Sequence, residues 1–416
     1  MEKIFNLKKT YQYLLILLAF LMPLTVSGSN IVIVTICIIW IFSGNYIEKF
    51  NQIISSKLII ATIVFYLVHI LGMLWTENLI WGFHMLHKMW YFLIFFPILF
   101  NIVQLKYIKY YTSAFLIAIA FTEIVSYLIW FEIIPPVRHA SVYNPTPFMS
   151  HISYNPILAF AIYFVYHDIL FNNKLSGIRA FLYIFFAATM TFNMFITGGR
   201  AGQVMYFAMI SILLMQLLNT QKIKALISIL VILPVIFFTA YSSSEIFNDR
   251  VDKVIFNTIN YEKNSNTSVG KRITYAINSW DIILENPLIG VGTGDFPGVY
   301  TKTNKQNCEK FASSVWYDSA MCQVSKKASY TSHPHNMYLL VLVQFGLIGL
   351  ISLMVIFYYQ IKLSFNSPSR FLRDFGFILP VLFLIAMLSD SYLLGHYTSL
   401  FFVFFSSFLY KDFEKN

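Results

Sequence analysis

Two histidines stand at the start of a long apolar run, in the stretch SHPHNMYLLVLVQFGLIGL at residues 332–350. An imidazole has an ordinary pKa near 6.5, so it can accept a proton near neutral pH. Either His333 or His335 could therefore accept a proton there, and we expect Asn336 to support the turn. Asp390 follows a later apolar run and could orient a histidine or hold an arginine.

The pattern H-x-H has two other interpretations. Two such histidines can bind a metal ion, but no cysteine, histidine or carboxylate stands near them in the sequence at zinc-site spacing. A purely structural role at the start of the helix also stays open. We predict a site that contains no metal and needs no cofactor.

A second candidate is Arg200 in the stretch TGGRAGQ, residues 197–203. It lies between two apolar segments, in a turn that contains Gly198, Gly199 and Gly202. Such a turn lets backbone N–H groups and a helix N-terminus face the same point as the guanidinium, an arrangement that binds anions. The alternative is an arginine that reaches out to lipid headgroups.

The third candidate stretch is GKRITYAINSWDIILENPLIGVGTGDFPG, residues 270–298. Its apolar residues recur at helical spacing: Ile273, Ile277, Trp280 and Leu284. They predict a helix that lies on the membrane surface and ends before Pro287. Lys271 and Arg272 fall in its first turn, where cations disfavour the helix, so either a bound anion or a solvated charge pair is expected there. The glycines resemble a dinucleotide-binding loop only superficially, because they follow a helix and not a strand.

The elements that must position these residues are membrane helices. The chain of 416 residues is 58% hydrophobic and only 12% charged, about half the charged fraction of a soluble domain. The net charge of +10 does not indicate nucleic-acid binding, because Lys and Arg cluster between apolar runs. We expect an all-α polytopic membrane protein with about twelve spans, at residues 12–27, 30–43, 57–75, 84–103, 110–133, 153–171, 178–197, 200–218, 223–241, 336–361, 375–390 and 396–410.

The distribution of basic residues predicts the orientation of these spans. With the N-terminus inside, sixteen basic residues fall on the cytoplasmic side, whereas the short outer loops hold only Lys88, Arg138 and Arg200. The expected organisation is spans one to nine over 1–241, an outer loop domain with short helices over 242–335, and the last three spans with a short cytoplasmic tail over 336–416.

The outer loop also contains two of the three cysteines. Cys308 and Cys322 lie on the oxidising side of the membrane, so we expect a disulfide between them, with two free thiols as the alternative. Another outer loop offers weaker candidates, each of which is more often structural than catalytic. They are Arg138, His139, Tyr143, His151 and Tyr154.

The three motifs, in this order, resemble the bacterial O-antigen ligase family, within a wider group that includes lipid-linked polysaccharide polymerases and protein O-oligosaccharyltransferases. The motifs are TGGRAGQ, the segment from Arg272 to Phe296, and HPHNMYLLVLVQFGLIGL. The resemblance implies a glycosyltransferase of the inner membrane with its site on the periplasmic side. It would transfer a glycan from undecaprenyl diphosphate to a sugar hydroxyl of lipid A–core. Arg200 and Arg272 would bind the diphosphate, and His335 would deprotonate the acceptor.

Other functions stay open beside the ligase. Polymerases of the group commonly have two substantial outer loops, and this chain has one long loop and one short one, which favours the ligase. A flippase or exporter would place charges along a central cavity, but Glu123 is the main charge expected in mid-span.

Overall fold

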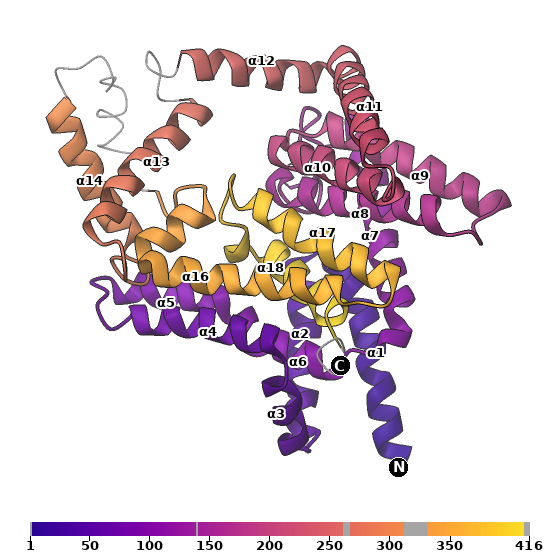
Figure 1. The fold of residues 1–416 in the computed structure, drawn as a ribbon, viewed down its shortest axis with the longest axis horizontal. Coiled ribbons are helices and arrows are strands. Elements are labelled where there is room, and N and C mark those ends of the chain that lie inside the picture. The colour runs from indigo at the N-terminus through magenta and orange to yellow at the C-terminus, as the bar shows by residue number, and fades with distance from the viewer. Residues whose placement is uncertain (1, 139, 261–266, 312–330, 412–416) are drawn as a thin grey trace.

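The computed structural model describes residues 2–138, 140–260, 267–311 and 331–411, and all regular elements there are helical (Figure 1). The prediction of an all-α membrane protein is therefore confirmed. The elements, with η marking short 3₁₀ or π segments, are α1 Glu2–Leu21, α2 Val26–Phe42, α3 Tyr46–Ile54, α4 Lys57–Gly72, α5 Leu79–Trp90, η1 Tyr91–Phe95, α6 Phe96–Ile102, η2 Leu105–Tyr107, α7 Ile108–Trp130, α8 His151–Phe171, α9 Gly177–Ile196, α10 Arg200–Leu217, α11 Lys222–Ser243, α12 Glu245–Ile259, α13 Ser268–Glu285, α14 Phe296–Phe311, α16 Met337–Phe365, α17 Arg370–Ala386, η3 Tyr392–Leu394 and α18 His396–Leu409.

The expected count of twelve spans is not confirmed. Within the described residues, seven helical segments are long and apolar enough to cross a membrane, or eight if the bent pair α2 and α3 forms one span. Two further apolar helices, α4 and α18, are shorter than a full span. A helix needs about 20 residues to cross the hydrocarbon core, so the 17 residues of α17 are also short.

The core of the protein lies around α8 and α18. All residues of α18 from Thr398 to Leu409 are buried, and α8 is buried along most of its length. Their aromatic rings interlock, with Phe160 of α8 centred 4.9 Å from Phe405 and 5.1 Å from Phe401 of α18. By contrast, only Ala225 and Ala240 of α11 are buried, so the apolar surface of that helix faces lipid.

The long helix α16 is broken at Gly346, where the backbone has a φ of +57°. The break would leave backbone donors unpaired in the membrane, a costly state that other elements must relieve. The segment Pro287–Phe296, here called the docking segment, relieves it, since the N–H groups of Leu347 and Ile348 donate to the carbonyls of Pro287 (2.9 Å) and Leu288 (3.3 Å).

The docking segment also accounts for the glycine run. A Cβ on Gly290 would lie 2.3 Å from the backbone of Gln344, and one on Gly294 would lie 2.5 Å from the backbone of Gly82. The glycines therefore allow close approach to α16 and α5, and no strand precedes them. The expectation that this run is not a dinucleotide-binding loop agrees with the fold.

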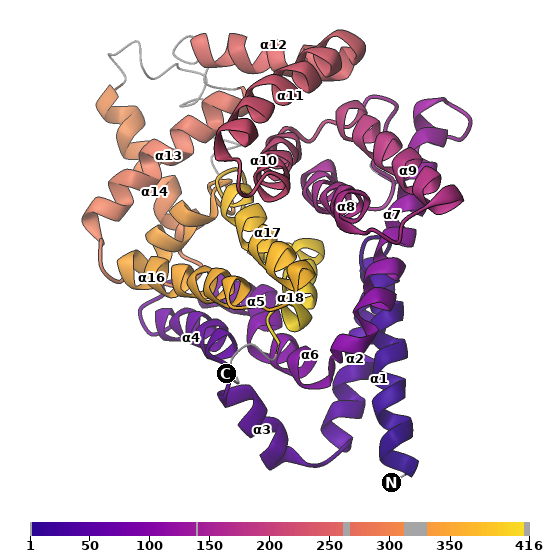
Figure 2. The ribbon, with the colours of Figure 1, turned by 45° about the vertical axis from the view of Figure 1, so that its right-hand side comes forward.

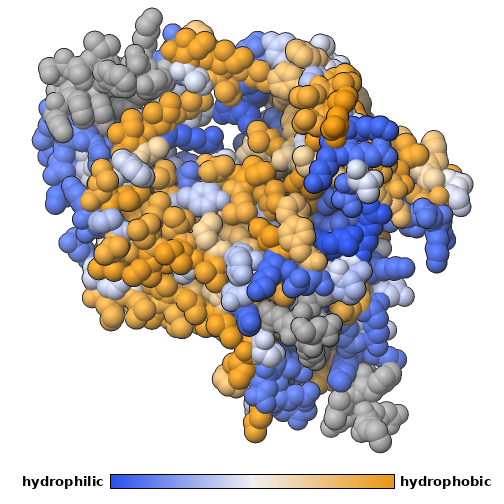
Figure 3. Space-filling view, viewed as in Figure 1, coloured by the Kyte–Doolittle hydropathy of each residue, from blue (hydrophilic) through white to orange (hydrophobic). Residues whose placement is uncertain are grey.

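The helices α12, α13 and α14 project beyond the bundle on one side (Figures 1 and 2). Polar contacts join α13 to α14, with Asn278 Nδ2 donating to Asn304 Oδ1 (2.8 Å) and Asn307 Nδ2 donating to Asn278 Oδ1 (2.9 Å). Figure 3 shows an opening below α12, between α13 and α10. The boundaries at residues 242 and 335, and the side of the membrane, stay predictions.

Candidate active site

Arg200 is held by a tight junction between α8 and α10. A Cβ on Gly199 or Gly202 would lie within 2.4 Å or 2.2 Å of Asn155, so only glycine lets α10 approach α8 this closely. Asn155 Nδ2 donates to Thr197 Oγ1 (2.8 Å) and to the carbonyl of Gly199 (3.3 Å). The buried side-chain amide of Asn155 on α8 therefore fixes the turn that carries Arg200.

The loop before α8 fixes the same turn from outside. The N–H of Gly198 donates to Asn144 Oδ1 (3.0 Å), and the amide of Asn144 also bonds His151 Nδ1 (2.9 Å). His151, one of the weaker candidates, thus supports this turn. Of the others, Tyr154 is buried and donates to Asn193, Tyr143 is exposed, and His139 lies outside the described residues.

Three arginines gather at this point, here called the arginine triad: Arg200, Arg250 and Arg272. Arg200 Nη2 donates to Ser268 Oγ (2.9 Å) at the start of α13, one turn before Arg272. Arg250 of α12 reaches the turn itself, since its Nη2 lies 3.2 Å from the point that a Cβ on Gly198 would occupy. The charges of Arg272 and Arg250 both act on Arg200.

The arginine triad carries positive charge that the described protein does not neutralise. No described carboxylate forms an ion pair with any of its three members. Like charges held together repel unless an anion lies between them, and guanidinium groups bind phosphate oxygens through paired N–H donors. The arrangement therefore suits a phosphate-bearing ligand.

The second part of the site is the histidine turn, Thr331–Asn336, which lies against Asp390. His335 Nδ1 is 3.4 Å from Asp390 Oδ2, and His333 Nδ1 is 3.5 Å from Oδ1. The N–H of Ser391 donates to Oδ1 at 2.7 Å and fixes the carboxylate. The fold thus places Asp390 beside both histidines, where it can orient a histidine, one of the two roles that its sequence position left open.

The hydrogen bonds distinguish the two imidazoles. The backbone N–H of His335 donates to His333 Nδ1 (3.3 Å), so the neutral ring of His333 carries its proton on Nε2. In His335, donation from Nδ1 to Asp390 leaves the lone pair on Nε2. The geometry therefore favours His335 as the proton acceptor.

The backbone of the histidine turn is constrained. His335 has a φ of +51°, in the left-handed region that is costly for a residue other than glycine. Asn336 caps α16 by accepting from the N–H of Leu339 (3.0 Å), and its own amide donates to the carbonyl of Leu388 (3.2 Å). Asn336 therefore supports the turn, as expected, and fixes it to the loop that carries Asp390.

The surroundings of His333 and Asp390 favour a neutral imidazole and an ionised carboxylate. Burial lowers the pKa of His333 to about 4, and the charges of His335 and Lys88 act in the same direction against the opposing effect of Asp390. Burial alone would raise the pKa of Asp390, but the hydrogen bond from His335 and the charges of the two histidines hold it below its usual value. A neutral His333 and an ionised Asp390 follow near neutral pH.

The helix α13 connects the arginine triad to the histidine turn. It carries Arg272 and, three residues later, Tyr275, whose ring stacks on that of His335 with centroids 5.9 Å apart. The charges of both Arg272 and Asp390 act on Tyr392. Arg272 and the histidine turn are therefore close to the same two tyrosines, Tyr275 and Tyr392.

A metal ion has one candidate set of ligands in the described part of the chain. Nitrogen atoms of His333 and His335 and an oxygen of Asp390 lie within 4.8 Å of one another. No carboxylate is close to the histidines in the sequence, but the fold brings Asp390, 55 residues after His335, next to them. The prediction of a metal-free site thus stays open to test.

Not every predicted residue joins the site. Arg138 donates to the carbonyl of Phe148 (3.2 Å), and no contact in the described residues links Arg138 or Lys271 to the arginine triad or the histidine turn. Cys308 is buried in α14, whereas Cys322 lies outside the described residues, so their disulfide stays a prediction.

Sequence reasoning missed Arg250, Asn144, Asn155 and Tyr275. Arg250 lies among Asp249, Asp252 and Lys253, a balanced pattern that is typical of an ordinary solvated helix. Asn155 had no local signal, because its partners Thr197 and Gly199 are more than 40 residues away in the sequence.

Residues 185–354 match the family model described as O-antigen ligase. In this part the chain is similar to the O-antigen ligase family. The match contains TGGRAGQ, α13, the docking segment and the histidine turn, so the resemblance inferred from those motifs is confirmed. The comparison with curated proteins gave no match. The apolar helices identify a multi-pass membrane protein. The family that its central part resembles acts, in general, on lipid-linked glycans and lipid acceptors.

Proposed function

We propose that the protein is an O-antigen ligase of the bacterial inner membrane. It transfers a glycan from undecaprenyl diphosphate to a sugar hydroxyl of lipid A–core in the periplasmic leaflet. The observation that carries the proposal is the pairing of three arginines, which no described carboxylate neutralises, with a histidine whose Nδ1 faces Asp390 and whose Nε2 can then take a proton.

The transfer is a single displacement that inverts the anomeric carbon. The acceptor oxygen forms a bond to that carbon while its proton passes to His335 Nε2. The bond from the anomeric carbon to the diphosphate breaks, and its electron pair goes to the phosphate oxygen. The arginine triad stabilises the negative charge of the undecaprenyl diphosphate that leaves. Asp390 holds the His335 ring and stabilises the imidazolium that forms.

No metal or cofactor takes part in this mechanism. The departing diphosphate is already a good leaving group, and the arginine triad supplies the positive charge that a divalent ion would otherwise provide. Transfer should therefore survive treatment with a chelator. Loss of transfer that a divalent ion restores would show instead that His333, His335 and Asp390 bind a metal.

The test is reconstitution of the purified protein with lipid-linked glycan and lipid A–core. We expect glycan to become attached to lipid A–core, and His335→Gln to abolish most of that product. Donor molecules that lengthen without any attachment to lipid A–core would identify a polymerase. Attachment to a protein acceptor alone would identify a protein O-oligosaccharyltransferase.

A further inference from the structure

A second polar site lies near both ends of the described chain, apart from the helices α12–α14 (Figure 1). A pocket there is lined by residues from α1, α2, α3, α6 and η2 and by Tyr410 and Lys411, which follow α18. Four lysines contribute to it: Lys8, Lys49, Lys106 and Lys411. We call it the lysine pocket.

The lysine pocket has an excess of positive charge. Among the described residues that line it, Glu48 is the one acidic residue, and Gln52 donates to that carboxylate (3.4 Å). No ion pair of Lys8, Lys49 or Lys106 occurs among the described residues. Lys49 Nζ is positioned by the carbonyl of Trp40 (2.6 Å) and Ser43 Oγ (2.7 Å). Its charge is therefore held at the pocket by neutral partners.

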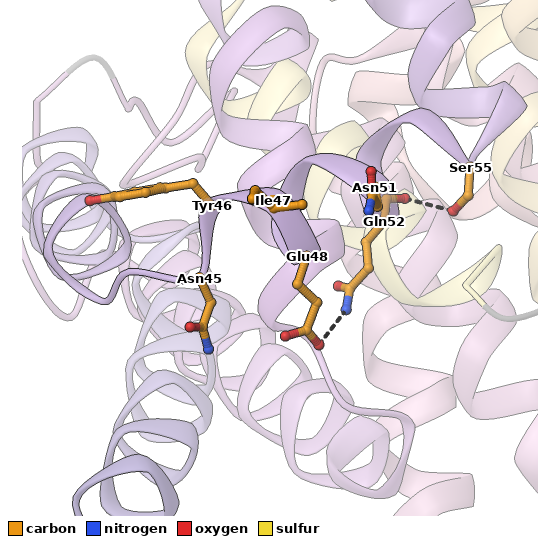
Figure 4. A pocket seen from close by; sticks show the side chains of 7 residues that line it. All are labelled: Asn45, Tyr46, Ile47, Glu48, Asn51, Gln52 and Ser55. Carbon is orange, nitrogen blue, oxygen red and sulfur yellow. Dashed lines mark hydrogen bonds between the residues drawn. The ribbon is translucent and has the colours of Figure 1, made fainter.

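The helix α3 places this pocket at a lipid boundary. The chain bends by 117° between α2 and α3, so α3 turns away from the direction of the span. Its apolar residues Tyr46, Ile47, Phe50 and Ile54 are 57%, 81%, 61% and 47% exposed, and none of its residues is buried. Its polar residues Glu48, Asn51, Gln52 and Ser55 line a second, neighbouring hollow together with Tyr46 and Ile47 (Figure 4). This pattern is typical of a helix that lies in the membrane interface.

We propose that the lysine pocket binds the phosphate of an anionic glycerophospholipid, whose acyl chains cover the apolar side of α3. Charge complementarity favours this ligand, because basic residues beside a span attract anionic lipid headgroups. Continuity with the apolar spans favours a lipid over a soluble phosphate, since the ligand must also cover exposed apolar side chains. The site is separate from the arginine triad and does not depend on the transfer reaction.

The test compares lipid binding by purified full-length variants. Lys8→Gln/Lys106→Gln changes two exposed pocket lysines, and the control Lys222→Gln/Lys224→Gln changes two lysines outside the pocket. Native mass spectrometry after exchange into phosphatidylglycerol and phosphatidylcholine measures which lipid is retained. Thermal unfolding checks that both variants are folded.

We expect the wild type and the control to retain phosphatidylglycerol over phosphatidylcholine, and the pocket variant to lose that preference about tenfold. Equal retention by the wild type and the pocket variant would overturn the proposal. An equal loss in the control would also overturn it, because it would show a general effect of surface charge. Preference for inorganic phosphate over phosphatidylglycerol in a competition experiment would show that the ligand is not a lipid.

Discussion

The docking segment and the histidine turn both contain conspicuous polar residues, yet the fold uses them in opposite ways. Asp295 of the docking segment is 5% exposed and accepts from Thr76 Oγ1 (2.8 Å) and from the N–H groups of Glu77 (2.8 Å) and Asn78 (2.9 Å). Asp390 accepts one backbone N–H and otherwise faces two imidazoles at 3.4 and 3.5 Å.

This difference separates a carboxylate that the protein saturates from one that we propose serves the transfer reaction. Asp295 is saturated by the protein and fixes the start of α5 against the docking segment. His335, which lies against Asp390 through Nδ1, has a side chain that is 35% exposed, so its Nε2 is available to a ligand. Polar groups that the protein positions without satisfying them point to a bound molecule. Changes to the docking segment should therefore impair folding, and changes at the histidine turn and arginine triad should impair transfer.

The largest effect is expected from Gly290→Leu in the docking segment. Gly290 has a φ of +67° and no room for a Cβ beside Gln344, so α16 cannot keep its position. We expect almost no folded protein on size-exclusion chromatography in detergent. Gly298→Ala is the matched control, because nothing lies within 4 Å of its Cβ position. A Gly290→Leu protein with normal yield and melting temperature would contradict the structural role of the docking segment.

Lysine substitutions in the arginine triad should weaken donor binding without unfolding the protein. Arg200→Lys, Arg250→Lys and Arg272→Lys keep the charge but lose the paired N–H donors, so we expect the donor Kd to rise about tenfold for each. Arg138→Lys, outside the triad, should have little effect. Unchanged donor affinity in all three variants would show that positive charge alone is sufficient.

Asparagine substitutions at the two aspartates should separate their roles. Asp390→Asn can donate to His335 Nδ1 and so place the imidazole proton on Nε2, the wrong position for a base. We expect the transfer rate to fall about 10- to 100-fold with an unchanged melting temperature. Asp295→Asn should instead lower the melting temperature. The reverse pattern would contradict the assignment of structural and reactive carboxylates.

The smallest effect concerns the acid sensitivity of the fold. Burial lowers the pKa of His333 to about 4, against an ordinary value near 6.5, and Asp390, His335 and Lys88 are the charged or titratable groups that act on it. The unfolded chain therefore binds a proton between these values while the folded chain does not, and stability falls as pH drops from about 6.5 to 4. His333→Gln should reduce the loss of melting temperature between pH 7 and pH 5 by about 2 °C. An identical loss in the wild type and the variant would exclude this contribution.

Sequence patterns predicted helices, and they placed Arg200, Arg272 and the histidine turn at helix starts, because each of these features depends on local spacing. The ends of α13 illustrate this, since it stops at Glu285, before Pro287, as expected. The convergence of Arg250 and the support from Asn155 could not be predicted, because they depend on contacts between distant segments. The role of the glycine run could not be predicted either. The break in α16 requires other hydrogen-bond acceptors for its backbone N–H groups, and the pattern of apolar residues does not show that break.

The account depends most on His335 as the proton acceptor, and one measurement tests this directly. Single-turnover transfer is measured at saturating donor and acceptor for the wild type, His335→Gln and the matched variant His333→Gln. We predict that His335→Gln lowers the rate by roughly 10²–10⁴-fold with unchanged donor affinity, whereas His333→Gln lowers it by less than about tenfold. A His335→Gln enzyme that keeps a rate near that of the wild type would contradict the account.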